Sequence, residues 1–172
     1  GTQTVTHEYL TLNGKVARET IRTNNTLTAV LDFVYDDAGR PFALRYSTNG
    51  TSFQTYYYVL NLQGDVVKLI QANGHVVAQY TYDAWGYILS SGGNLATVNP
   101  LRYRGYYYDS ETGFYYLQSR YYDPQNRRFI NADSYASTGQ GFVGTNMFAY
   151  CNNSPILFVD HDGDDAEAVG WW

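Results

Sequence analysis

Tyrosine followed by aspartate and, a few positions later, by glycine is the feature that most constrains this chain. The 172 residues include 19 tyrosines and 16 glycines, and the pattern occurs at Tyr35–Gly39, Tyr82–Gly86 and Tyr108–Gly113. Asp favours turns because its side chain can hydrogen-bond nearby backbone, and Gly tolerates the positive φ that many turns need. A strand and turn that recur along a sequence indicate a repeat architecture.

The residues between the turn signals favour strands. Residues 27–35, 56–60 and 75–82 are rich in β-branched and aromatic side chains, which fit a pleated, partly buried surface. Asn13-Gly14 and Asn73-Gly74 are hairpin signals. We therefore predict an all-β chain of successive antiparallel hairpins. A single hairpin cannot bury a core, so the sheet must curl or stack its neighbours.

Two local patterns give further expectations. Ala78, Tyr80 and Tyr82 alternate with polar residues, which predicts that these three side chains share one buried face. Residues 90–100 are small, polar and rich in glycine, and we expect them to form an exposed, mobile loop.

Composition excludes several classes of protein. The net charge is −5 and no basic cluster is present, so we expect no nucleic-acid partner. No segment is long and apolar enough to predict a membrane-spanning helix. Cys151 is the single cysteine, which excludes a disulfide within the chain and predicts a small core residue. We expect no cofactor, and we interpret the chain as a C-terminal fragment of a longer protein.

A long ordered stretch then carries a family resemblance. Residues 100–133, with Gly105-Tyr106-Tyr107-Tyr108-Asp109 at their centre, and residues 146–160 resemble the RHS repeat-associated core. The looser repeats before residue 100 resemble the YD repeats of RHS proteins, ABC-toxin C components and teneurins. The resemblance implies YD repeats over 1–99 and an RHS core with a plug and cleavage segment over 100–172. It also implies one spiral antiparallel sheet forming a hollow shell, with the core curling inward as an end plug.

The same resemblance implies partners and a location. The partners are further YD repeats before this segment and a downstream toxin or effector domain that the shell encloses and presents. The location is outside the cell or at its surface. Because a short run of repeats leaves sheet edges unpaired, we also expect the isolated chain to self-associate.

Autoproteolysis after the core is a further implication of the resemblance. The family's cleavage motif places aspartate at Asp133 and Asp160, although this chain lacks the motif's prolines and the glycine that would follow Asp133. Two carboxylates in a dry site can share a proton, so that one acts as base and the other as acid. Asp123 and Arg128 are candidates for supporting them. The alternative is that these aspartates only stabilise turns.

Three other interpretations remain open on the sequence. Asp160, Asp162 and Asp164 precede or follow a glycine in a pattern similar to a calcium loop. Exposed tyrosines could stack on sugar rings, which would make the chain a carbohydrate-binding module of a cell surface or wall. Trp171-Trp172 could plug an apolar lumen or form a frayed terminus.

Overall fold

The computed structural model describes residues 1–132 and 147–168, where the regular elements are strands apart from two short 3-10 helices. Asp133, Trp171 and Trp172 lie outside the described residues. The first eight strands are β1 (Val5–Leu12), β2 (Lys15–Thr23), β3 (Thr26–Tyr35), β4 (Pro41–Ser47), β5 (Gln54–Leu60), β6 (Val66–Ile70), β7 (Val76–Tyr82) and β8 (Ile88–Gly92). The remaining elements are η1 (Tyr103–Gly105), β9 (Tyr107–Asp109), β10 (Phe114–Leu117), β11 (Arg120–Asp123), β12 (Arg128–Phe129), η2 (Cys151–Asn153), β13 (Phe158–Asp160) and β14 (Ala166–Ala168).

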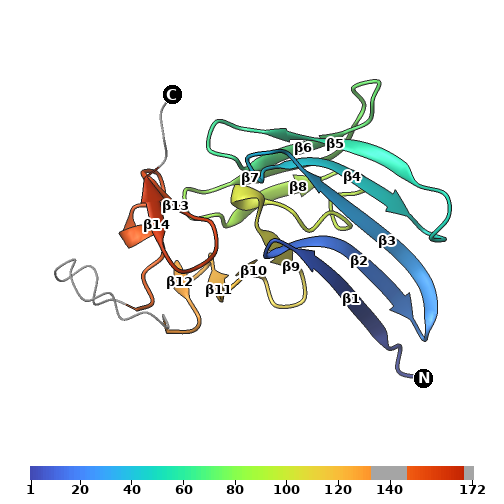
Figure 1. The fold of residues 1–172 in the computed structure, drawn as a ribbon, viewed down its shortest axis with the longest axis horizontal. Coiled ribbons are helices and arrows are strands. Elements are labelled where there is room, and N and C mark those ends of the chain that lie inside the picture. Colours follow the sequence, from blue (N-terminus) through green and yellow to red (C-terminus); the bar gives the residue numbers. More distant parts are fainter. Residues whose placement is uncertain (133–146, 169–172) are drawn as a thin grey trace.

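Strands β1 to β8 form one sheet in chain order, so every connection is a hairpin and every pair is antiparallel (Figure 1). Strands β9 to β12 form a second, four-stranded sheet, and β13 pairs with β14. The predicted all-β fold of consecutive antiparallel hairpins is therefore confirmed. The order places β1 and β8 at the two edges of the large sheet, which is not closed into a barrel.

One turn geometry recurs at the same end of the large sheet. Asp36 and Asp83 each accept two backbone N–H groups through Oδ1, from the residues two and four positions later. Asn61 makes the equivalent pair of bonds in the turn between β5 and β6. A glycine at positive φ completes these turns, at Gly39 and Gly86 for example. The recurring Asp and Gly of the sequence thus encode a recurring turn.

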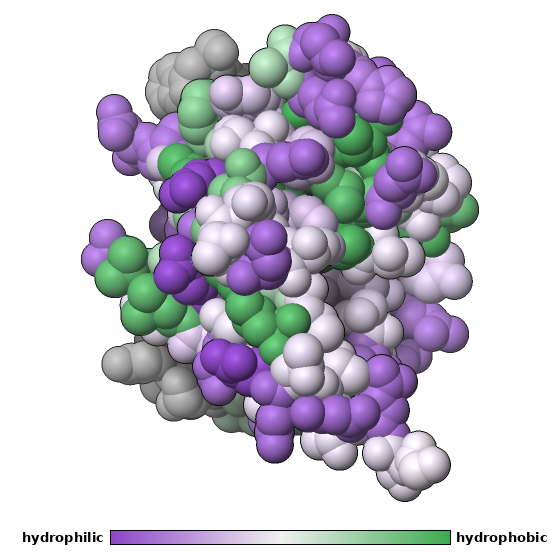
Figure 2. Space-filling model, turned by 90° about the vertical axis from the view of Figure 1, so that its right-hand side faces the viewer, coloured by the Kyte–Doolittle hydropathy of each residue, from purple (hydrophilic) through white to green (hydrophobic). Residues whose placement is uncertain are grey.

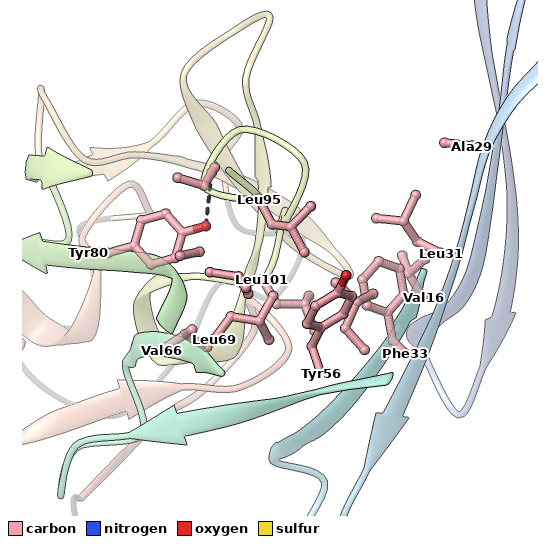
Figure 3. Packing of buried hydrophobic residues seen from close by; sticks show 14 residues of the cluster. Val16, Ala29, Leu31, Phe33, Tyr56, Val66, Leu69, Tyr80, Leu95 and Leu101 are labelled. Carbon is pink, nitrogen blue, oxygen red and sulfur yellow. Dashed lines mark hydrogen bonds between the residues drawn. The ribbon is translucent and has the colours of Figure 1, made fainter. Parts of the chain in front are cut away.

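The inner face of the large sheet, defined here by Leu31, Leu44, Tyr56, Leu69 and Tyr80, carries the first hydrophobic cluster. Figure 3 shows side chains of this cluster pointing toward one another across the strands, among them Leu31, Tyr56, Leu69 and Leu101. The predicted alternation in β7 is confirmed, because Ala78 and Tyr80 are buried and Tyr82 packs against the same cluster.

The structure corrects the expectation of an exposed loop over residues 90–100, of which 90–92 belong to β8. Leu95, Ala96 and Leu101 cover the inner face of the sheet and are buried, although Gly93 and Asn94 are exposed. Asn99 is fully buried and donates to the Leu101 carbonyl at 2.7 Å, while its Oδ1 accepts from the Tyr58 hydroxyl at 2.8 Å. The segment is therefore part of the core rather than an exposed loop throughout, because its few apolar residues close over a sheet that would otherwise lack a second layer.

A second cluster lies in the C-terminal half and is dominated by aromatic rings. Tyr115, Tyr122, Phe129 and Tyr150 are fully buried, and the rings of Tyr122 and Tyr150 stack with centroids 4.0 Å apart. Cys151 is buried in this cluster, as predicted, and burial raises the pKa of its thiol to about 12. Such a thiol is protonated at neutral pH and serves as packing.

The exposed surface mixes polar and apolar residues. On the face shown in Figure 2, green hydrophobic patches are interrupted by purple hydrophilic residues. Among the described residues, no helix has the length and apolar character needed to cross a membrane.

Candidate functional site

The C-terminal segment meets the repeat sheet at the turn between β7 and β8. Three tyrosine hydroxyls donate to three successive backbone carbonyls of this turn: Tyr103 to Ala84 at 2.8 Å, Tyr122 to Trp85 at 2.7 Å and Tyr115 to Gly86 at 2.9 Å. A buried hydroxyl needs a partner, and so does a carbonyl that has lost contact with water. The three bonds therefore fasten the C-terminal segment to the end of the repeat sheet.

Gly86 allows this close contact. A Cβ atom built at Gly86 would lie 2.5 Å from Cδ1 of Tyr103, and Gly86 also has a positive φ of 83°. Only glycine satisfies both conditions without displacing the ring.

Arg104 provides a second link at the neighbouring turn. Its side chain donates to the Gln63 carbonyl at 2.6 Å and to the Pro155 carbonyl at 2.6 Å, and its guanidinium lies 3.6 Å from the Asp65 carboxylate. The Arg104 backbone N–H also donates to Asp65. One buried cation therefore joins the β5–β6 turn to the segment at Pro155, which lie 41 residues before and 51 residues after Arg104.

Asp160 lies at the end of β13 in a buried, charged environment. Its side chain is 2% exposed and stands 3.6 Å from the guanidinium of Arg120, which is 6% exposed. Its Oδ1 accepts the Gly163 N–H at 2.6 Å. Burial raises the pKa of Asp160 to about 7, although the Gly163 N–H and Arg120 act in the opposite direction. Near neutral pH this carboxyl can exist in both protonation states, as a general acid or base requires.

The other predicted site residues differ in their surroundings. Asp123 accepts the N–H groups of Gln125 and Asn126 and a bond from the Asn126 side chain, so its carboxylate caps a turn. Arg128 is exposed at the start of β12, paired in register with Asp123. Asp133 lies outside the described residues, so its pairing with Asp160 stays a prediction.

The calcium interpretation gains no support within 1–132 and 147–168. No group of three or more His, Cys, Asp or Glu side chains there could hold a metal ion. Asp162 Oδ1 instead accepts the N–H of Asp164, as an ordinary turn aspartate does.

Among the described residues, seven tyrosines are buried and four, Tyr9, Tyr57, Tyr87 and Tyr121, are exposed. Those that are buried are Tyr56, Tyr80, Tyr103, Tyr106, Tyr115, Tyr122 and Tyr150. Their rings belong to the two hydrophobic clusters, and they are thus not displayed as a track for sugars. This distribution favours a shell wall over a carbohydrate-binding surface.

Sequence reasoning missed the buried arginines. Arg102, Arg104 and Arg120 are each less than 9% exposed, and the guanidinium of Arg102 lies over the rings of Tyr80 and Tyr108. The sequence signal was that these arginines lie in a tyrosine-rich stretch with little acidic charge nearby. Buried arginines pair readily with aromatic rings and backbone carbonyls, so this pattern could have predicted their burial.

Taken together, a sheet of consecutive antiparallel hairpins whose turn end is bonded to a tyrosine-rich segment defines an all-β repeat protein. The family described as teneurin YD-shell matches residues 18–156, and the chain belongs to this family. The resemblance to YD-repeat proteins is thereby confirmed.

Relatives and solved structures agree with this assignment. The chain is 39% identical over 132 residues to the tRNA3(Ser)-specific nuclease WapA of Bacillus spizizenii, covering 76% of this chain and 5% of that protein. It is 37% identical over 90 residues to the double-stranded DNA deaminase toxin A of Burkholderia cenocepacia, covering 51% of this chain and 6% of that protein.

The crystal structure of TcdB2-TccC3-TEV has a similar fold. The TM-score is 0.75 at 22% identity, over 94% of this chain and 8% of the solved chain. The chain therefore spans less than a tenth of the length of each of these proteins.

Proposed function

We propose that this chain is the end-sealing part of a YD-repeat shell that encloses and presents a downstream toxin or effector domain. The observation that carries the proposal is the set of three tyrosine hydroxyls that fasten the C-terminal segment to the β7–β8 turn. We also propose that the repeats occupy 1–99 and the core 100–172, in keeping with a large sheet that ends at Gly92.

The named activities of the relatives support the proposal that this segment encloses another domain and does not itself carry the activity. One relative is a tRNA nuclease and another a DNA deaminase, yet both share with this chain a segment that is only 5% and 6% of their length. A segment common to proteins with different chemistries suits a container better than a catalyst. Because one relative is named a toxin, we also propose that the protein acts outside the cell or at its surface.

The enclosure can be tested on a longer protein that carries the preceding repeats and a downstream domain. We expect the downstream domain to resist added protease. Tyr103→Phe combined with Tyr122→Phe should remove two hydrogen bonds of the seal and make that domain accessible. Tyr87→Phe, at an exposed tyrosine, is the control. Equal digestion of the downstream domain in the unaltered and doubly substituted proteins would refute the proposed seal.

We further propose that the core cleaves the chain after itself, with Asp160 and Asp133 as the acid–base pair. The supporting observation is the burial of Asp160 beside Arg120. In the reaction, the ionised carboxylate takes a proton from water and the resulting hydroxide attacks the peptide carbonyl. The neutral carboxyl then gives a proton to the leaving nitrogen, which yields one new carboxylate and one new amine.

Intact mass measurement on a chain that continues past Trp172 tests this step. We expect two fragments from the unaltered chain and one uncut species from either Asp133→Asn or Asp160→Asn. Asp164→Asn, at a turn position outside the pair, should still be cut. Cleavage of both Asp133→Asn and Asp160→Asn at the same bond would show that the pair is wrongly assigned.

A further inference from the structure

A groove lined by tyrosine separates the edge of the large sheet from the second sheet. Its volume is about 260 Å³, and we call it the tyrosine groove. It is lined by Tyr9, Thr11, Val16, Tyr107, Asp109, Tyr116 and Tyr121.

The groove opens on the inner face of the large sheet. Thr11 is paired in register with Val16, and Tyr9 with Glu19, so these pairs project to the same side. Val16 belongs to the inner-face cluster and Glu19 is buried at 2% exposure. The groove is therefore continuous with the face that the shell turns inward.

The second sheet supplies a complete row of rings to the opposite wall. Tyr107, Tyr116 and Tyr121 are register partners across β9, β10 and β11. The rings of Tyr116 and Tyr121 are 5.3 Å apart, and the ring of Tyr107 meets that of Tyr9 edge-on at 5.7 Å. Tyr9 and Tyr121 remain 52% and 42% exposed. Two walls of the groove therefore present uncovered aromatic surface.

The charged groups beside the groove already have partners. His7 Nδ1 lies 2.6 Å from the Glu19 carboxylate. The Asp109 carboxylate accepts the N–H of Glu111 and the hydroxyl of Thr112. A polar ligand such as a sugar needs directed hydrogen-bond partners, and these carboxylates are committed elsewhere. An aromatic or large aliphatic side chain needs only the ring surface.

We propose that the tyrosine groove binds an extended segment of the enclosed polypeptide by accepting its aromatic or large aliphatic side chains. This inference rests on the proposed function, since it assumes that the inner face meets an enclosed chain. Tyr9 and Tyr107 meet edge-on across the groove, and the groove volume of about 260 Å³ beside the exposed Tyr121 ring can take a side chain. Recognition by ring surface alone tolerates many sequences, which a container for different domains requires.

The test uses the isolated chain at a concentration where it is monomeric. The probe is a labelled synthetic peptide in which Phe alternates with Ser between terminal Lys residues, and binding is followed by fluorescence anisotropy. We expect Tyr121→Ser and Tyr9→Ser each to weaken binding by about tenfold, because each removes one stacking surface. Tyr9→Phe keeps the ring and should bind as the unaltered chain does. Tyr87→Ser removes an exposed tyrosine elsewhere and should have no effect.

Several outcomes would overturn the inference. These are no binding, equal binding of Tyr121→Ser and the unaltered chain, or equal binding of a matched peptide with Ala in place of Phe. Displacement of the peptide by a chitin oligosaccharide, lost in Tyr121→Ser, would assign the groove to sugars instead. None of these results alters the protease test of the seal, which uses Tyr103 and Tyr122 in a longer protein, so failure of the groove and failure of the shell are distinguishable.

Discussion

Gly86 combines a conformational and a steric requirement in one residue. Gly74 has nearly the same backbone, with φ of 84° against 83° for Gly86, but a Cβ there would meet no atom within 4 Å. The two glycines thus form a matched pair that separates backbone preference from packing.

We expect Gly74→Ala to lower the free energy of unfolding by about 1 kcal/mol, the cost of a left-handed alanine. Gly86→Ala should lower it by about 2 kcal/mol more, because the new methyl group displaces the Tyr103 ring. Urea denaturation measures both. Equal losses in the two variants would show that the ring moves without cost.

Asp160 predicts an unusual dependence of stability on pH. Its pKa is raised to about 7 in the folded chain from an ordinary value near 4, so the folded state binds this proton more tightly than the unfolded state does. The contribution of Asp160 to the free energy of unfolding is therefore fully present at low pH and is lost as pH rises through about 7.

An asparagine side chain cannot ionise, so Asp160→Asn should remove this loss of stability at high pH. We expect the stability of Asp160→Asn relative to the unaltered chain to increase between pH 5 and pH 8 by an amount on the order of a few kcal/mol. Denaturant unfolding at several pH values measures it, and contributions from other carboxylates cancel in the difference. A difference that stays constant with pH would contradict the raised pKa.

At the scale of elements, the β7–β8 turn is both a repeat turn and a docking surface. Asp83 organises it from within by accepting two backbone N–H groups, which leaves the carbonyls of residues 84–86 directed outward. The tyrosines of η1, β10 and β11 then occupy those carbonyls. The same turn geometry occurs at Asp36, where it caps the end of β3.

Replacing a docking tyrosine by phenylalanine tests this arrangement. Tyr115→Phe and Tyr122→Phe should each lower the free energy of unfolding by about 1 kcal/mol, the usual net loss for one buried hydrogen bond. Tyr121→Phe, whose ring is partly exposed in the neighbouring row, should change it by less than about 0.5 kcal/mol. Chemical denaturation of the three variants provides the comparison. Equal losses in the free energy of unfolding would contradict a special role of the turn carbonyls.

Across the whole molecule, the edge at β1 is the most exposed element. All eight of its residues are exposed, and the strand pairs only with β2 in the described sheet. Leu10 and Leu12 are 55% and 62% exposed. Unpaired backbone beside apolar side chains favours pairing with another strand.

We therefore expect the isolated chain to associate as its concentration increases. Light scattering should show the increase, and Leu10→Lys should suppress it by placing charge on the edge. Leu62→Lys, at a turn leucine that is 96% exposed, is the matched control and should still associate. A clean monomer at high concentration would contradict the prediction.

The repeats were predictable from sequence because their signals are local. Turns are predicted by Asp36 and Gly39 and by Asp83 and Gly86. The alternation around Tyr80 predicts a strand with one buried face. The burial of Leu95 was not predictable, since small and polar neighbours surround it and only the completed sheet offers it a partner. Arg120 and Asp160 are forty residues apart, so their pairing depends on how the C-terminal segment returns to the second sheet.

The seal at the β7–β8 turn recognises main-chain atoms. The three hydroxyls donate to the carbonyl oxygens of Ala84, Trp85 and Gly86, atoms that every residue type carries. Hydrogen bonds to backbone carbonyls do not depend on the side chains of the residues that carry them. Gly86 is the exception, because a side chain there would displace the Tyr103 ring. We therefore expect substitutions at position 84 to leave the three hydrogen bonds intact, whereas the Trp85 ring also packs against the second cluster and contacts Arg127.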